Sequence, residues 1–149
     1  MSLPALAKLV PHTPPMLLLD QVLSYEPPTV TCGLHLKEGA LFVRNGQVSS
    51  AVGLEYMAQA IAAYVGMERR LAGLPPLHGY LVGARAFQVN VPHINVGNEL
   101  QVSATLTWND SHSGAFACRI ERGAELVASA HLTVYQPDLP LGHTAQGAP

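Results

Sequence analysis

The spacing of hydrophobic residues changes along the chain, and each change predicts a different kind of element. In residues 47–71, apolar side chains occupy all sides of a stretch that contains no proline. Ser49 or Ser50 can cap its start and Gly73 can end it, which predicts a helix of about six turns. A helix that is apolar on every side must be wrapped by other structure.

The flanking segments alternate polar and apolar residues with the period of two that is typical of strands. Two such segments precede the helix and four follow it. They are residues 16–25, 29–37, 79–91, 99–108, 115–122 and 125–135. Two strands, an apolar helix and a four-stranded meander predict an α+β fold, in which a curled antiparallel sheet wraps around one long central helix.

Length and composition indicate how the chain is divided into domains. The chain has 149 residues, of which 48% are hydrophobic and 12% charged, as expected for one compact domain with a sizeable core. We place this domain at residues 1–136. Residues 137–149 hold three Pro and two Gly with little to bury, which predicts a flexible tail.

Charge and cysteine content exclude several classes of function. The net charge of −2 and the lack of a basic stripe disfavour nucleic acid as a partner. The chain shows no secretory signal and no apolar run long enough to span a membrane, so we expect a cytoplasmic protein. Cys32 and Cys118 form no C-x-x-C pattern, and the seven His lack metal-ligand spacing. We therefore expect free thiols, no metal and no cofactor.

Glu55 is the only formal charge between Arg44 and Glu68. It could lie on a narrow solvent-exposed stripe of the helix, or accept hydrogen bonds at a helix start. The alternative, which we favour, is a carboxyl group kept protonated by apolar surroundings at the mouth of a cavity. Gln59 lies one turn later on the same face and could hydrogen-bond to it.

Three segments resemble the 3-hydroxyacyl-acyl carrier protein dehydratases, which have the hotdog fold. Residues 11–20 (PHTPPMLLLD) are similar to the family's opening segment, and residues 54–59 (LEYMAQ) to its central-helix motif. Residues 95–100 (NVGNEL) resemble its turn before a strand. Together these motifs, in this order, imply a lyase that removes water from a 3-hydroxyacyl thioester.

The chain departs from this family at the catalytic base. Where typical members carry Gly-His-Phe-Pro, residues 40–43 read ALFV, and Ser49-Ser50 replaces the family's Pro-Gly at the helix start. The sequence resembles most the divergent dehydratase-like branch of aryl polyene and related polyketide-type pathways, which lacks that loop His.

The resemblance implies roles for residues of the central helix. Dehydration needs a base for the α-proton, an acid for the leaving hydroxyl and donors for the thioester oxygen. Glu55 is the expected acid. The backbone N–H of Ser50 is the expected oxyanion donor, and Ser50, Ala51 and Gln59 are the expected substrate-binding residues.

Two histidines are candidates for the missing base. His78 follows the helix and opens a strand, although a surface loop would explain it equally well. His12 lies in a constrained proline-rich segment, which its hydrogen bonds could instead hold in place.

Three functions remain open at this point. The first is a dehydratase in fatty-acid or polyketide-type synthesis, with a relocated or partner-supplied base. The second is a hotdog thioesterase that uses the central-helix Glu. The third is a non-catalytic subunit that binds an acyl chain or pairs with an active dehydratase. The expected substrate is an acyl carrier protein or coenzyme A thioester, for which Arg44, Arg69, Arg70 and Arg85 are possible contacts. We expect a homodimer or higher even oligomer, or a heteromer with an active dehydratase.

Overall fold

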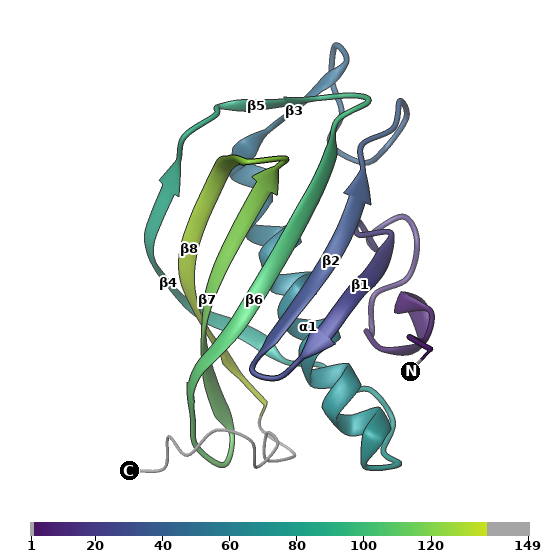
Figure 1. Ribbon diagram of the computed structural model, residues 1–149, viewed down its shortest axis with the longest axis vertical. Coiled ribbons are helices and arrows are strands. Elements are labelled where there is room, and N and C mark those ends of the chain that lie inside the picture. The colour runs from purple at the N-terminus through teal and green to yellow at the C-terminus, as the bar shows by residue number, and fades with distance from the viewer. Residues whose placement is uncertain (1, 137–149) are drawn as a thin grey trace.

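The computed structural model describes residues 2–136, so the tail predicted at 137–149 lies outside the described residues. Six strands form one antiparallel sheet in the order β1-β2-β6-β7-β8-β4. Their bounds are β1 Gln21–Glu26, β2 Thr29–His35, β4 Tyr80–Val89, β6 Glu99–Asn109, β7 Ser113–Arg122 and β8 Glu125–Tyr135. Figure 1 shows this sheet curling around the single long helix α1, Gly53–Leu71, which confirms the predicted α+β architecture.

The helix begins six residues later than the sequence pattern predicts. Gln47–Ser49 forms a short strand, β3, which pairs with β5, His93–Asn95, a segment that lies between two of the predicted strands. A 3-10 turn, η2, at Ser50–Val52 then leads into α1. The pairing of β3 with β5 joins segments far apart in sequence, so it overrides the local helical pattern.

Helix α1 is enclosed as its composition predicts. Side chains that are 2% exposed or less point from every turn of its middle part, including Tyr56, Met57, Ala60, Ile61 and Tyr64. The chain after the 3-10 turn η1, Leu6–Lys8, lies against the far half of the helix, where Leu9 meets Gly66. A Cβ atom on Gly66 would lie 2.1 Å from the Leu9 carbonyl oxygen, so only glycine permits this close approach.

The predicted first strand, residues 16–25, starts only at Gln21. The residues before it are held by a side chain of the central helix, since Leu18 N–H donates to Gln59 Oε1 at 2.8 Å. The other strand predictions agree with the structure to within two residues at each end. A polar helix side chain therefore anchors the residues that precede the first strand.

Strand β4 forms one edge of the sheet and pairs only with β8. Large apolar side chains along it are open to solvent: Tyr80 is 58% exposed, Leu81 44% and Val82 60%. Exposed apolar edge strands are sites at which another chain adds to a sheet. This edge is a candidate interaction surface.

Cys32 and Cys118 are free thiols buried in the sheet. Burial raises the pKa of each thiol to about 12, so both remain protonated and unreactive at neutral pH. No helix within residues 2–136 is long and apolar enough to cross a membrane. In the same part of the chain, no three His, Cys, Asp or Glu side chains lie where they could hold a metal ion.

Candidate active site

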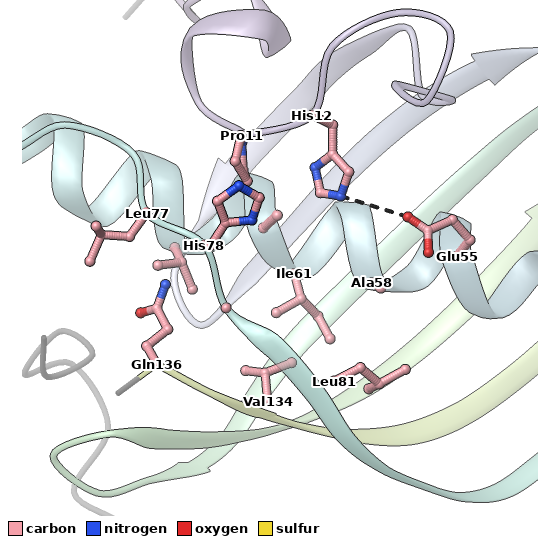
Figure 2. Close-up of a pocket in the computed structure, with 13 residues that line it drawn as sticks. Pro11, His12, Glu55, Ala58, Ile61, Leu77, His78, Leu81, Val134 and Gln136 are labelled. Atoms are coloured by element: carbon pink, nitrogen blue, oxygen red, sulfur yellow. Dashed lines mark ion pairs between the residues drawn. The ribbon is translucent and has the colours of Figure 1, made fainter. Parts of the chain in front are cut away.

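A cavity of about 160 Å³ lies between helix α1, the proline-rich segment around His12 and the start of strand β4. Its polar side chains are His12, Glu55, His78 and Gln136. Residues of the helix, the sheet and the loops next to them, nearly all apolar, form the rest of its wall (Figure 2). Segments from both ends of the chain therefore meet at one face of the central helix.

Glu55 and His12 meet at one end of this cavity. Glu55 lies in the first turn of α1, and its Oε2 is 3.7 Å from His12 Nε2 (Figure 2). The side chains of His12 and Glu55 are 25% and 38% exposed, so the apolar enclosure expected around Glu55 is only partial. The structure brings together the candidate acid and one of the two candidate bases.

The surroundings of His12 favour its neutral form. Burial lowers the pKa of His12 from its usual 6.5, the Glu55 carboxylate raises it, and His78 lowers it further. The net direction is downward, so the ring is uncharged at neutral pH. His12 Nδ1 is buried and has no hydrogen-bond partner within the described residues. An uncharged imidazole next to a carboxyl group can accept a proton from a substrate.

Gln59 holds the two halves of the site in place. Its Nε2 donates to Glu55 Oε2 at 2.9 Å and to the Met16 carbonyl oxygen at 2.7 Å, while its Oε1 accepts from Leu18 N–H. Gln59 is fully buried, and both of its amide hydrogens are used. Its observed contacts orient Glu55 and anchor the opening segment, and leave no donor for a substrate.

Ser50 and Ala51 lie outside the cavity wall. The Ser50 N–H donates to the Pro92 carbonyl oxygen at 2.9 Å, and its hydroxyl donates to the Val91 carbonyl oxygen. The Ala51 N–H donates to Ser49 Oγ at 3.2 Å. Because these N–H groups already have protein partners, the geometry gives no support to the oxyanion and substrate-binding roles predicted for the two residues.

His78 and Gln136 lie at the end of the cavity away from Glu55 (Figure 2). His78 is exposed in the segment before β4. The ion pair with Glu55 is made by His12 and not by His78. Gln136 follows β8 and is only 3% exposed. Sequence reasoning missed Gln136, because a lone polar residue after a strand carries no motif.

The loop that lacks the family's usual His lies near the start of α1. Phe42, in the left-handed conformation with φ of 74°, lines an open groove with Arg44, Ser49 and His93. Arg44 is exposed, whereas Arg69 is buried and its Nε donates to the Pro75 carbonyl oxygen. Arg69, one of the four arginines predicted to contact the substrate carrier, therefore already has a hydrogen-bond partner within the protein.

Comparisons with known proteins agree with this architecture. The model of the ApeP-like family, described as ApeP dehydratase, matches residues 4–146. A chain of the dehydratase heterocomplex ApeI:P from Xenorhabdus doucetiae is 28% identical, with a TM-score of 0.87 over 92% of this chain and 93% of that one. The search of curated proteins found no match.

Two more distant structures share the fold alone. The uncharacterized protein PH1136 from Pyrococcus horikoshii is 13% identical, with a TM-score of 0.65 over 88% of this chain and 92% of that one. The thioesterase superfamily member 2 from Mus musculus is 14% identical, with a TM-score of 0.57 over 77% of this chain and 80% of that one. Together with the sheet and helix described above, these neighbours confirm the hotdog fold.

Proposed function

This chain belongs to the ApeP-like dehydratase family, and from that premise we propose that it removes water from a 3-hydroxyacyl thioester, with His12 as the base and Glu55 as the acid. The observation that carries the proposal is the pair that His12 and Glu55 form at the end of an apolar cavity. It offers a base in place of the loop His that residues 40–43 lack.

The proposed reaction uses both partners of this pair once. His12, uncharged, takes the α-proton from C2 of the acyl chain, and the electrons of that C–H bond form the C2–C3 double bond. The C3–O bond breaks, and the departing hydroxyl takes a proton from Glu55 to leave as water. Because the two side chains lie 3.7 Å apart, the proton gained by His12 can return to Glu55 and reset the site.

Glu55 has an oxygen available for this role. Oε2 accepts from Gln59 and faces His12, while Oε1 has no hydrogen-bond partner within the described part of the chain. Oε1 is therefore the atom that would meet the substrate hydroxyl. The Gln59 contacts keep the carboxyl group in one orientation, as general acid catalysis requires.

The proposed substrate is carried by a phosphopantetheine arm, on acyl carrier protein or coenzyme A. The groove beside Phe42 and Arg44 supports an anionic carrier, because its wall contains Arg44 and His93 but no acidic residue. Arg44 makes no ion pair within the described residues. A guanidinium group that is not already in an ion pair can bind a phosphate.

Purified protein supplied with 3-hydroxyacyl thioesters should form the enoyl thioester, visible by its ultraviolet absorbance. Saturated acyl thioesters of the same length should release no free thiol. Thiol release without water loss would assign the chain to the thioesterases instead. If neither product forms, alone or after mixing with a dehydratase subunit that it binds, the proposed chemistry is wrong.

We propose that strand β4 pairs with a second hotdog chain, either another copy or a related dehydratase subunit. The exposed apolar side chains of this edge strand support the pairing, and the related chain from Xenorhabdus doucetiae comes from a heterocomplex. Since Leu81 of β4 lines the cavity, an added chain would lie next to the site and could supply donors for the thioester oxygen.

Val82→Glu on β4 should therefore reduce the assembly to a monomer of 15.8 kDa, as measured by sedimentation at micromolar concentration. Val82 is 60% exposed in a single chain, so the new charge is costly only when a partner buries it. Leu23→Glu, on the opposite edge strand β1, is the matched control and should remain assembled. A wild-type protein that sediments as a monomer would contradict the proposed pairing.

A further inference from the structure

His12 is not fixed in the site by hydrogen bonds of its own ring. Its Nδ1 atom is buried and has no hydrogen-bond partner within the described residues. Its Nε2 atom faces Glu55 Oε2 at 3.7 Å, which is longer than a hydrogen bond. The separation between the His12 ring and the Glu55 carboxyl group must therefore be set by the backbone on either side of His12.

The backbone around His12 is fixed to helix α1 at two points. After His12, the Gln59 side chain donates to the Met16 carbonyl oxygen at 2.7 Å. Before His12, the Leu9 carbonyl oxygen lies against Gly66, where an added Cβ atom would be only 2.1 Å away. The segment that carries His12 therefore spans the distance between two anchors on the same helix.

Both anchors and Glu55 lie on one face of α1. Gln59 comes four residues after Glu55, and Gly66 comes seven residues after Gln59. Both spacings return to the same side of an α-helix. A segment held at Gln59 and Gly66 therefore runs along the face that carries Glu55, and Figure 2 shows His12 on this segment beside that carboxyl group.

The connection from Leu9 to His12 is short and stiff. Val10 and Pro11 are the two residues between them. Proline fixes its own φ and restricts the residue before it. Leu9 and Val10 are also packed in the core, where they are 1% and 3% exposed. A displacement of the Leu9 carbonyl group is therefore transmitted to His12, because the residues between them cannot absorb it.

We propose that Gly66 is a positioning residue: it lets the anchor before His12 lie directly on the helix, and so keeps His12 beside Glu55. A glycine inside a helix weakens that helix relative to alanine, and the close contact gives a reason for it here. The catalytic consequence rests on the proposed function, whereas the effect of Gly66 on the geometry of the pair does not.

Gly66→Ala should weaken the electrostatic coupling between His12 and Glu55. To reach an ordinary contact with the new methyl group, the Leu9 carbonyl oxygen must move by roughly 1 Å or more. NMR titration of the His12 ring in the full-length protein, in its natural assembly, measures the coupling. In the wild type, Glu55→Gln should lower the pKa of His12, because the Glu55 carboxylate raises it.

In the Gly66→Ala background, the same Glu55→Gln replacement should change the pKa of His12 by about half as much or less, because water enters between the separated groups. His78, which also lowers the pKa of His12, is present in both backgrounds and cancels from the comparison. A Gly66 that served only the stability of the helix would leave this coupling unchanged.

Turnover gives the second readout. The kcat for a 3-hydroxyacyl thioester should fall about 10- to 100-fold in Gly66→Ala, because catalysis is sensitive to a shift of roughly 1 Å. Gly33→Ala, on β2, is the matched control. A Cβ atom there would lie 3.3 Å from Leu23 Cδ1, at the end of a 40% exposed side chain that can move away. The control should change neither kcat nor the coupling.

A folded Gly66→Ala protein with undiminished coupling would overturn the positioning role, as would a wild type in which Glu55→Gln leaves the pKa of His12 unchanged. Melting curves establish that each variant is folded. If Gly66→Ala does not fold, Leu9→Ala replaces it, because loss of that buried side chain loosens the same anchor without a clash. The coupling should again diminish, and undiminished coupling there counts equally against the proposal.

Coupling and turnover together separate this inference from the proposed function. If Gly66→Ala loses the coupling but dehydrates at the wild-type rate, Gly66 positions His12 although the pair is not the catalytic one. A wild type that dehydrates no thioester, with coupling that Gly66→Ala removes, leads to the same conclusion. If the coupling survives in Gly66→Ala while His12→Ala abolishes dehydration, the proposed chemistry stands without the positioning role.

Discussion

Glu55→Gln is expected to lower kcat/KM for a 3-hydroxyacyl thioester by at least about 100-fold, the scale of a general acid, while leaving the melting temperature nearly unchanged. Glutamine has almost the size of glutamate but carries no proton to donate to the leaving hydroxyl. Its carbonyl oxygen can still accept the hydrogen bond from Gln59 Nε2, which measures 2.9 Å to the carboxyl group. The packing should therefore survive while the chemistry is lost.

Turnover and melting temperature must be measured on the same preparation, because a structural Glu55 would produce the reverse pattern. In that case the variant would melt earlier, and the folded fraction would stay active. Glu99→Gln is the matched control. Glu99 lies on β6, and its side chain is 83% exposed next to His35. The control should change neither quantity, and an active but destabilised Glu55→Gln protein would remove Glu55 from the catalytic pair.

His12→Ala should cause a loss of similar size, at least about 100-fold in kcat/KM, whereas His78→Ala should retain turnover. The reason is geometric, since His12 is the histidine that the structure places 3.7 Å from Glu55. Added imidazole should restore part of the activity of His12→Ala by occupying the vacated space. Full activity of His12→Ala, or loss of activity only in His78→Ala, would move the base to His78.

The pH profile gives a second readout for His12. A base must be uncharged, so activity should fall on the acid side as His12 takes up a proton. Burial lowers the pKa of His12, His78 adds to that shift and Glu55 opposes it, so the acidic limb should lie below pH 6.5. Because this pKa is lower in the folded than in the unfolded protein, protonation below pH 6.5 also favours unfolding. Melting curves at each pH separate the two effects, and a limb well above pH 6.5 would contradict the assignment.

The sequence alone determined the features that depend on local spacing. A proline-free stretch with apolar residues on all sides must be enclosed, and α1 is enclosed by the sheet. Except for the first segment, which becomes a strand only at Gln21, the alternating segments became strands within two residues of the predicted bounds. Residues four apart share a helix face, which placed Gln59 against Glu55 at the hydrogen-bonding distance observed.

Only the tertiary structure decided which distant segments meet. The strand pairing of β3 with β5 delays the start of the helix, and the Pro92 carbonyl oxygen occupies the N–H of Ser50. The path of the opening segment brings His12 to Glu55, and the end of β8 brings Gln136 to Gly79. Periodicity describes a residue's neighbours along one element, but such contacts depend on how loops return the chain to the sheet. A pair of side chains that two distant segments bring together, such as His12 and Glu55, therefore leaves no signal in the spacing of either segment.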